Sequence, residues 1–451
     1  MGEGKKIRNV AEIVKENSNN NSIVIVTSAI NGLTDQLLGI VEKARKGESS
    51  IGVLDVLQKR HEQAVQDAIT KAEIRNKVRK EILDLFQRLK SIVESVTILK
   101  ELTPRSKDYI VSFGERLAAP ILAGTLEDLG LRTVCLTGGE AGIITDDNFG
   151  EANPLMEMTR QKVRDTLDTI MAKGIVPVLT GFIGATQNGD ISTLGRGGSD
   201  YSAAIVGSCI DADEVWIWTD VDGLMTADPK IVNNCRIIPQ ISYAEAAEMV
   251  ILGAKAMHPR ALEPAKQRGI PIRIKNTFNP SASGTLISKD ITVKKGEIVK
   301  GVAAIKDVAL INISGMSMVG MPGTAAKVFN ILGSQGINVI MISQSISESN
   351  ISLLVRRNQL AKGLNALELA LLAGSAVKDI SFEDDVSAIA VIGAGMKGTH
   401  GVASRLFGAV AKKNINVRMI AQGSSELNIS FVVSEKDCDE TIRTVHGEFK
   451  L

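Results

Sequence analysis

Aromatic residues are scarce in this sequence of 451 residues, where they make up only 3%. The charges almost cancel as well, because 52 basic residues stand against 51 acidic ones and leave a formal net charge of +1. Proteins that bind nucleic acid usually carry an excess of basic residues, and many stack bases on aromatic rings. The composition therefore argues against a nucleic-acid partner.

Cysteine and long apolar runs are also rare. The four cysteines stand singly, without the paired spacing of a zinc site or the density of a disulfide scaffold. No apolar run approaches the roughly 20 residues of a membrane helix, and "MGEGKKIRNVAEIVKEN" at the N-terminus contains no signal-peptide core. We expect a cytoplasmic protein with free thiols, no metal-ligating cluster and no membrane partner.

Short apolar segments that end in Thr, Gly or Asp alternate with helical stretches over the first part of the chain. They include "LRTVCLTG" (131–138), "GIVPVLTGFIG" (174–184) and "DEVWIWTDVDG" (213–223). From residue 52 to about 105, apolar side chains recur every three or four positions, which predicts long helices. The alternation favours an α/β fold, in which a mostly parallel sheet is sandwiched by helices. Ligands of such sheets bind beyond the carboxyl ends of the strands.

The chain repeats itself beyond residue 305. The segment "GINVIMISQSISESNISLLV" (336–355) returns as "NINVRMIAQGSSELNISFVV" (414–433), so that Gln422 follows its counterpart Gln344 by 78 residues. Each copy reads as strand, glycine turn, helix, strand and strand, which predicts two small α/β modules. A purely structural duplication is the alternative, but polar positions such as Asn338 and Asn416 recur together with the apolar ones.

The segment "TLGRGGSDYSAA" (193–204) is the first candidate for a ligand site. The N–H groups and the dipole of a helix that begins near Ser199 favour an anion. Gly197 and Gly198 allow an oxyanion to approach the backbone, and the Arg196 guanidinium can form two hydrogen bonds to a carboxylate or phosphate. The simpler alternative is that Ser199 only caps the helix and Asp200 only complements its dipole.

Other motifs place polar residues after strands or at helix starts. In "WTDVDGLMTADPK" (218–230), Thr219 and Asp220 follow an apolar strand, although Asp-Gly and Asp-Pro are ordinary turn formers. "SFGERLAA" (112–119) places Glu115 at a helix start, either as a cap or as a receptor for an ammonium group. "TSAINGLTD" (27–35) places Ser28 and Thr34 in a loop after a strand.

A lysine and two histidines are further candidates for ligand contacts. In "GAKAMHP" (253–259), Lys255 is a candidate phosphate partner, although a solvated lysine is the simpler interpretation. His61 and His258 show no nucleophile–base or metal pattern, and we interpret both as structural.

Together these motifs resemble those of the aspartate kinase family, which combines the amino-acid kinase fold with two C-terminal ACT modules. The resemblance covers nearly the whole chain and rests on "SAINGLTD", "SFGERLAAP", "GIITDDNFGEA", "GFIGATQNGDISTLGRGGSDYSAA", "TDVDGLMTADP", "ISYAEAAEMVILGAKAMHP" and "NTFNPSASGTLI". It implies a catalytic domain over residues 1–290, with a helical subregion at about 52–105. A connecting segment at 291–305 and ACT modules at 306–380 and 386–451 would follow.

The resemblance also implies a reaction. The side-chain carboxylate of L-aspartate would attack the γ-phosphoryl group of ATP and give 4-phospho-L-aspartate, the first step of lysine, threonine and methionine biosynthesis. Because two anions must meet, positioning and charge neutralisation would supply most of the catalysis. Mg²⁺ would be coordinated mainly by the ATP phosphates.

Three sets of residues match functional positions of the family. The catalytic set is Arg196, which would hold a substrate carboxylate, with Asp200 and Ser28, which would orient donors or magnesium-bound water. The substrate-binding set, in which Glu115 would bind the α-ammonium group, is Thr34, Glu115, Arg196, Gly197, Gly198 and Ser199. The ATP-binding set is Thr219, Asp220, Met225, Lys230 and Lys255. Met225 stands where relatives often have a tyrosine, so we expect a tuned ATP affinity.

ACT modules of this family sense an amino acid at a module–module interface and commonly pair across subunits. The matching effector positions are Asn338, Gln344, Asn416 and Gln422. The two glutamines match threonine-sensitive members, whereas Ile340 stands where lysine-sensitive relatives can carry an aspartate. We expect inhibition by threonine, with lysine as the rival effector, and a homo-oligomer.

The main departure from the family lies at the N-terminus. The family opens with a strand and loop of the form K-F-G-G-T-S, whose lysine spans the phosphates, whereas this sequence starts at "MGEGKKIRN". Since the other site motifs are intact, we expect the true start to lie upstream. The alternative is a catalytically weak, amino-acid-sensing regulatory subunit.

A kinase acting on glutamate, acetylglutamate or uridylate is a further alternative. A fused homoserine dehydrogenase is not expected.

Overall fold

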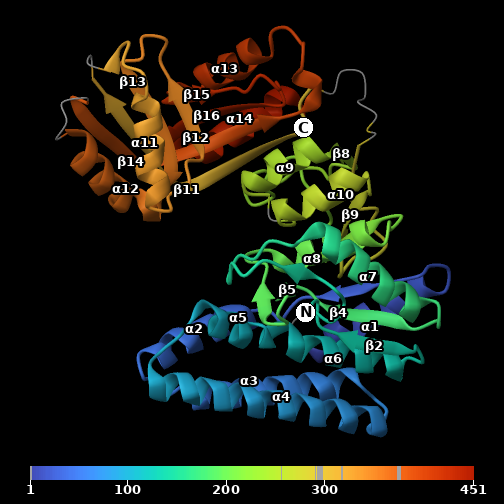
Figure 1. Cartoon of the computed structure of the whole chain (residues 1–451). Coiled ribbons are helices and arrows are strands. Elements are labelled where there is room, and N and C mark those ends of the chain that lie inside the picture. The colour runs from blue at the N-terminus through green and yellow to red at the C-terminus, as the bar shows by residue number, and fades with distance from the viewer. Residues whose placement is uncertain (1–2, 255, 290, 292–297, 316–317, 373–376) are drawn as a thin grey trace. The chain divides into compact units, whose positions relative to one another are not determined.

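The computed structural model describes residues 3–254, 256–289, 291, 298–315, 318–372 and 377–451 (Figure 1). The chain forms two compact units. Unit 1 comprises Met1–Asp222 and Met257–Lys289, and unit 2 comprises Gly223–Ala256 and Asp290–Leu451. Among the described residues, no helix combines the length and the apolar character that a bilayer crossing demands.

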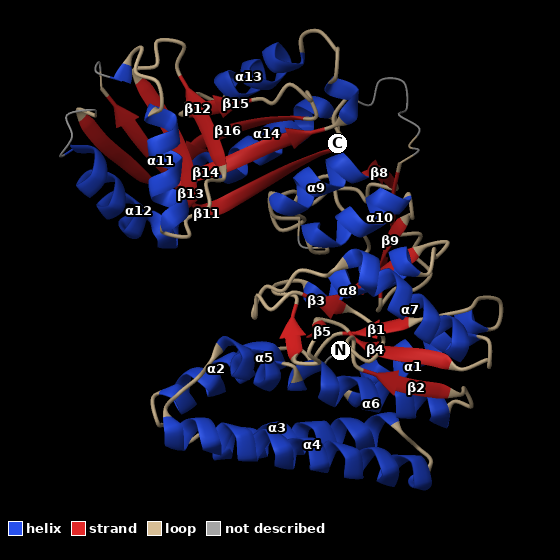
Figure 2. Ribbon diagram, in the orientation of Figure 1, coloured by secondary structure: helices blue, strands red, loops and turns tan. Residues whose placement is uncertain are grey.

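Parallel strands form the centre of unit 1 (Figure 2). Strands β1 (Ile25–Thr27), β4 (Val176–Thr180) and β2 (Thr133–Leu136) pair in parallel in the order β1-β4-β2. A second parallel pair joins β7 (Val215–Thr219) to β9 (Ile272–Asn276), and β10 (Thr285–Ser288) runs antiparallel to β9. A small third sheet contains β3 (Ile144–Thr145), β5 (Ile183–Thr186) and β6 (Ile191–Thr193). The predicted α/β class is confirmed.

Helices cover these sheets. Those of unit 1 are α1 (Gly4–Ser18), α2 (Leu33–Arg45), α3 (Ile51–Ala68), α4 (Ala72–Leu99), α5 (Pro104–Val111), α6 (Phe113–Asp128), α7 (Met156–Met171), α8 (Gly198–Cys209) and α10 (Leu262–Arg268). Helix α6 is buried along nearly its whole length and packs against α1, α4, β2 and β4. The helical region predicted from residue 52 is the pair α3 and α4, which lie side by side in Figure 1.

One carboxylate joins this helical pair to the rest of unit 1. The turn between α3 and α4 is held by Asp128 at the end of α6, whose oxygens accept the Thr70 hydroxyl at 2.8 Å and the Lys71 N–H at 2.7 Å. Arg8 of α1 donates to the same carboxylate at 2.7 Å. Asp128 is only 6% exposed, so its charge requires these partners.

Unit 2 contains the two predicted modules. Its sheet has the order β12-β13-β11-β14-β16-β15. The first module contains β11 (Gly301–Ser314), α11 (Thr324–Ser334), β12 (Met341–Gln344), β13 (Asn350–Arg356) and α12 (Leu360–Leu367). The second contains β14 (Asp379–Ile392), α13 (Val402–Lys412), β15 (Met419–Ala421), β16 (Asn428–Ser434) and α14 (Cys438–Phe449).

The two modules share their longest strands. β11 and β14 each extend over 14 residues. The later part of β11, residues 308–314, pairs with β13, while its beginning, residues 301–305, pairs with residues 388–392 of β14. Conversely, residues 379–383 of β14 pair with β11, and residues 386–392 pair with β16. Each module therefore completes its sheet with a strand segment that continues into the other module.

The segment Gly223–Ala256 packs within unit 2, although it lies inside the catalytic domain expected at 1–290. It contains β8 (Gln240–Ser242) and α9 (Tyr243–Ile251). The physical reason is apolar contact, since Ala227 and Val232 belong to the same buried cluster as Phe431 and Val445 of the second module. Alternation of strands and helices along the sequence contains no information about such contacts.

The interior of the helical pair in unit 1 provides a stability test. Leu89 and Leu99 both lie on α4, but Leu89 is fully buried and Leu99 is 67% exposed. We expect Leu89→Ala to lower the free energy of unfolding by about 2–5 kcal/mol, because it leaves a cavity in the core. Leu99→Ala should change it by less than about 0.5 kcal/mol. Urea denaturation followed by circular dichroism measures both, and equal losses would contradict this assignment of the core.

Candidate active site

The loop between β6 and α8 contains the "GRGGSD" motif. Strand β6 ends at Thr193 and α8 begins at Gly198, one residue before the helix start that the sequence predicted. Gly195 and Gly197 have φ values of 76° and 68°, a region that favours glycine. The first N–H groups of α8 have no partner within the helix and lie at its positive end.

Close approach of other segments fixes the shape of this loop. A Cβ atom on Gly197 would lie 2.1 Å from Cγ of His258, and one on Gly198 would lie 2.6 Å from Cδ2 of Phe182. His258 thus packs directly against the loop, in keeping with the structural role expected from the sequence. No side chain larger than hydrogen fits at either glycine without a shift of its neighbours.

Three charged side chains hold the loop by hydrogen bonds. Asp108 of α5 accepts the Thr193 N–H at 2.7 Å and the Thr193 hydroxyl at 2.9 Å. Arg260 donates to the Leu194 carbonyl oxygen at 2.7 Å. Asp200 in the first turn of α8 accepts the His258 N–H at 2.9 Å, and burial raises the pKa of its carboxyl. The sequence identified Asp200 but missed the other two.

The missed residues had weak signals. Asp108 stands in "KDYIV", a helical stretch in which a charged residue is expected to be exposed. In the structure it is only 2% exposed and also accepts the Gly150 N–H at 2.9 Å. The one indication in the sequence that Asp108 is buried is its position one turn before the apolar residues at the start of α6. Arg260 lies over the Tyr201 ring at 4.6 Å, a contact between segments that are distant in sequence.

Arg196 contrasts with these fixed groups because it is exposed. Its guanidinium makes no ion pair with any residue that the structure describes. Burial, followed by the charges of Arg260 and Arg196, lowers the pKa of His258, which shows that positive charge gathers beside the loop. Arg196 is therefore available to bind an anion.

Glu115 is the second group with an incomplete set of partners. It lies in the first turn of α6, is 3% exposed, and accepts the Ala29 N–H on Oε1 at 3.1 Å. Its Oε2 is buried without a hydrogen-bond partner. Burial raises the pKa of Glu115 to about 8, against the opposing hydrogen bond from Ala29. A buried, unsatisfied carboxylate oxygen fits a cationic ligand.

The loop after β1 lies between these two groups. A Cβ on Gly114 would lie 3.1 Å from the Ala29 Cβ and 3.6 Å from the Thr34 hydroxyl oxygen, so this loop passes beside Glu115. A Cβ on Gly181, which follows β4, would lie 2.8 Å from both the Thr27 carbonyl oxygen and the Ser199 Cα. The β1 loop and the start of α8 are therefore neighbours. Ser28 is exposed and Thr34 is half-buried at this edge.

The motif that the sequence suggested for nucleotide binding begins at the end of β7. Thr219 donates to Asp220 at 3.3 Å, and its carbonyl oxygen accepts the Thr277 N–H at 2.9 Å. Asp222 accepts from the Asn276 side chain at 2.9 Å, which ties the motif to the end of β9. The first segment of unit 1 ends at Asp222, so Met225 and Lys230 belong to unit 2. Lys255 lies outside the described residues.

The expected effector positions gather on two strands that meet. β12 and β15 are the first and last strands of the sheet order, yet they contact each other. Gln344 ends β12 and Gln422 follows β15, while Asn338 and Asn416 precede these strands. All four side chains are exposed, and none is hydrogen-bonded to another described residue.

Other recurring polar positions have a structural role. Glu348 and Glu426 both adopt a φ of 55°, and their carboxylates accept the N–H groups of Gly320 at 3.0 Å and Gly398 at 2.7 Å. In each module this contact holds the glycine loop before the helix. The glutamates thus serve the fold, and the glutamines and asparagines remain available for a ligand.

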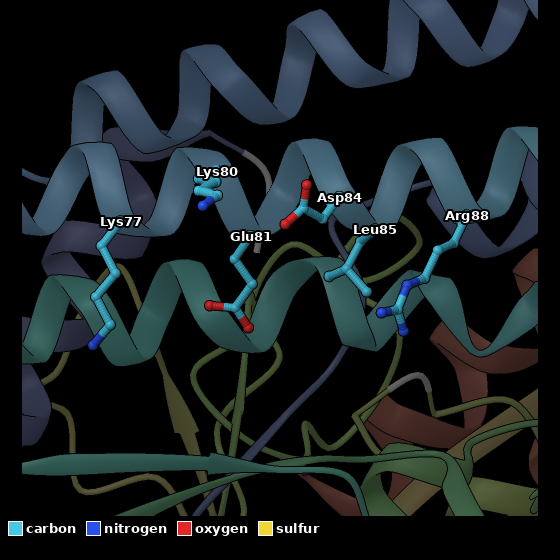
Figure 3. A pocket seen from close by; sticks show the side chains of 6 residues that line it. All are labelled: Lys77, Lys80, Glu81, Asp84, Leu85 and Arg88. Atoms are coloured by element: carbon cyan, nitrogen blue, oxygen red, sulfur yellow. The ribbon is translucent and has the colours of Figure 1, made fainter.

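A hollow of about 380 Å³ lies elsewhere, on the exposed side of α4, and contains none of the site residues. Figure 3 shows the side chains that line it: Lys77, Lys80, Glu81, Asp84, Leu85 and Arg88. All come from one helix, and basic and acidic groups are mixed, which is typical of a solvated helix face.

The profiles of two protein families match parts of this sequence. The sequence profile of the amino acid kinase family matches residues 1–276. That of the ACT domain matches residues 311–371 and 389–449, within the two repeated modules.

Several curated proteins align over the whole chain or most of it. The bifunctional aspartokinase/homoserine dehydrogenase 1, chloroplastic, of Zea mays is 35% identical over 458 residues, which cover 100% of this chain and 49% of that protein. Aspartokinase 1, chloroplastic, of Arabidopsis thaliana is 33% identical over 437 residues, which cover 95% of this chain and 75% of that protein. The chain spans about half the length of the bifunctional relatives.

Solved structures show the same architecture. E. coli aspartokinase III in complex with aspartate and ADP matches with a TM-score of 0.84 and 26% identity, covering 100% of this chain and 97% of that one. Clostridium acetobutylicum aspartate kinase matches with a TM-score of 0.81 and 27% identity, covering 100% and 98%. The chain belongs to the aspartokinases of the amino acid kinase family and carries two ACT domains.

Proposed function

We propose that this protein is an aspartate kinase that phosphorylates the side-chain carboxylate of L-aspartate with ATP and gives 4-phospho-L-aspartate. The product would enter lysine, threonine and methionine biosynthesis. The observation that carries the proposal concerns two groups near the loop after β1: the Arg196 guanidinium just before α8, and the buried Glu115 carboxyl in the first turn of α6. A small amino acid with a carboxylate and an ammonium group complements both.

Each end of the substrate would meet a charged group that has hydrogen-bonding capacity left over in the described part of the structure. Arg196 would form two charge-assisted hydrogen bonds with a carboxylate, and the N–H groups at Gly197, Gly198 and Ser199 would add donors. Glu115 would accept from the α-ammonium group, with Thr34 beside it. Because the loop is fixed by Asp108 and Arg260, little reorganisation would be needed on binding.

The nucleotide would bring the second anion to this edge. Thr219, Asp220, Met225, Lys230 and Lys255 are the proposed ATP contacts, and E. coli aspartokinase III, with a similar fold, was solved with aspartate and ADP. Mg²⁺ would be held mainly by the phosphates, with Asp200 and Ser28 orienting donors or water around it. Arg196 and the N–H groups of α8 would then stabilise the negative charge that develops during phosphoryl transfer.

We further infer that the meeting edges of β12 and β15 bind a regulatory amino acid, and that threonine is preferred over lysine. The exposed amides of Gln344 and Gln422 can both donate and accept hydrogen bonds, as a zwitterion requires. E. coli aspartokinase III was solved with lysine and aspartate, at a TM-score of 0.78 to this chain, so lysine is the natural competitor in the test.

We also propose that the protein forms a homo-oligomer and is located in the cytoplasm. Exposed apolar residues on the ACT modules, among them Ile342 at 46% and Ile346 at 104% exposure, favour a homo-oligomer formed through these modules. The four cysteines are free, which suits a reducing compartment such as the cytoplasm.

Replacement of Arg196 tests the substrate site. We expect Arg196→Ala to raise the Kd for aspartate about 30-fold, because a hydrogen bond to a charged group contributes roughly 2 kcal/mol. The Kd of Arg196→Lys should lie between those of the unsubstituted chain and Arg196→Ala, since lysine keeps the charge but cannot form the paired hydrogen bonds. Calorimetry measures the affinities, and hydroxylamine trapping measures acyl phosphate. The control is Arg88→Ala on the exposed side of α4. Unchanged aspartate affinity in Arg196→Ala would refute the proposed site.

Proton release tests the role of Glu115. With a pKa of about 8, Glu115 is mostly protonated at pH 7, and an ammonium group beside it requires the charged form. Aspartate binding should therefore release close to one proton at pH 7 and almost none at pH 9. Calorimetry in buffers of different ionisation enthalpy gives this number. Glu115→Gln should abolish the release, whereas Glu94→Gln on the exposed side of α4 should preserve it. Proton release that persists in Glu115→Gln would show that the Glu115 carboxyl is not the source of the proton.

Titration with threonine and with lysine tests the effector. We expect binding heat with threonine, and we expect Gln344→Ala or Gln422→Ala to weaken that binding at least about threefold through a lost hydrogen bond. Gln335→Ala, also exposed in the first module, is the matched control. Heat with lysine and none with threonine would reverse the assignment. Threonine binding by a chain that forms no acyl phosphate would favour a regulatory subunit.

A further inference from the structure

The second half of the nucleotide motif folds as a short hairpin within unit 2. Thr226 N–H donates to the Arg236 carbonyl oxygen at 2.9 Å, and Ile238 N–H donates to the Leu224 carbonyl oxygen at 2.8 Å. Residues 223–238 thus form one compact loop with Lys230 at its exposed tip. Its apolar side chains, Ala227 and Val232, point into the core of the second ACT module.

The C-terminal helix α14 holds this hairpin through polar contacts. His446 Nε2 lies 3.0 Å from the Thr226 hydroxyl oxygen. Arg443 donates to the Ile231 carbonyl oxygen at 3.3 Å, and Arg236 donates to the Lys450 carbonyl oxygen at 2.6 Å. Three polar contacts therefore join the hairpin to α14.

The His446 contact is buried and specific. His446 is 3% exposed and Thr226 is 7% exposed. Burial, followed by the charge of Arg236, lowers the pKa of His446, which favours the neutral ring. The Thr226 hydroxyl oxygen accepts the Arg236 N–H at 3.0 Å, which leaves its hydrogen free for donation to Nε2. Loss of either partner leaves a buried polar atom unsatisfied.

A second segment of the expected nucleotide site is held in the same way. Helix α9 precedes Lys255 in the sequence, and its Glu248 accepts from the Asn428 side chain at 2.5 Å. Glu245 accepts the Ala394 N–H at 2.6 Å. Both partners belong to the second ACT module. The motif itself divides at Gly223, whose φ of 146° suits glycine.

We propose that His446 is a positioning residue for the nucleotide loop, and that through it the second ACT module sets the place of Met225 and Lys230. This inference rests on the proposed function, since it assigns a determinant of nucleotide affinity to a residue that touches neither substrate. Aspartate is held by groups of unit 1 alone, so a change at His446 should act on nucleotide affinity and leave aspartate affinity unchanged.

The test compares the affinities for MgADP and for aspartate in the full chain by calorimetry. We expect His446→Phe to raise the Kd for MgADP about three- to tenfold, the effect of one lost buried hydrogen bond. His446→Gln, whose amide can replace Nε2, should restore most of the affinity. His400→Phe, at an exposed histidine of the same module, should change nothing.

A second pair of variants approaches the contact from the hairpin. Thr226→Val removes the hydroxyl with little change in volume, and Thr226→Ser keeps it. Of these two, we expect only Thr226→Val to weaken MgADP binding. The double variant Thr226→Val/His446→Phe should bind MgADP no more weakly than the weaker-binding of the two single variants.

Each outcome decides one of the two proposals. Unchanged MgADP affinity in both His446→Phe and Thr226→Val would overturn the role of His446, as would an equal loss of aspartate affinity. An unsubstituted chain that binds aspartate but not MgADP would overturn the proposed function, and with it the positioning role. MgADP binding that weakens in the variants, with aspartate binding intact, supports both.

Discussion

The candidate site depends on how closely three backbone segments approach one another at the ends of β1 and β4. Gly181 lies between the Thr27 carbonyl oxygen and the Cα of Ser199, and a Cβ there would come within 2.8 Å of both. This approach brings the loop after β1, and with it Glu115, beside the first turn of α8. The proposal that one small amino acid binds to both Arg196 and Glu115 depends on this approach.

Much of this arrangement could be predicted from the sequence because its causes are local. The helix start at Gly198 follows from two glycines, a hydroxyl and a carboxylate in succession. The parallel strands follow from short apolar runs between helical stretches, and the repeated modules follow from recurrence of the same pattern after 78 residues. Glu115 was identified as a cap or an ammonium receptor, and its unsatisfied oxygen favours the second interpretation.

What could not be predicted depends on contacts between distant segments. Asp108 reads as a surface charge within its helix, yet it is buried against Thr193, 85 residues away in sequence. Arg260 holds the Leu194 carbonyl oxygen across a separation of 66 residues. The packing of residues 223–256 in unit 2 has the same origin, because only the folded structure shows that Ala227 and Val232 complete the core of the second module.

The long strands β11 and β14 link the two ACT modules to each other. Since each supplies hydrogen-bonded residues to both modules, no cut of the chain separates one module without removing a strand from the other. Either module alone would lack a strand segment of its sheet, so we expect the two modules to unfold together.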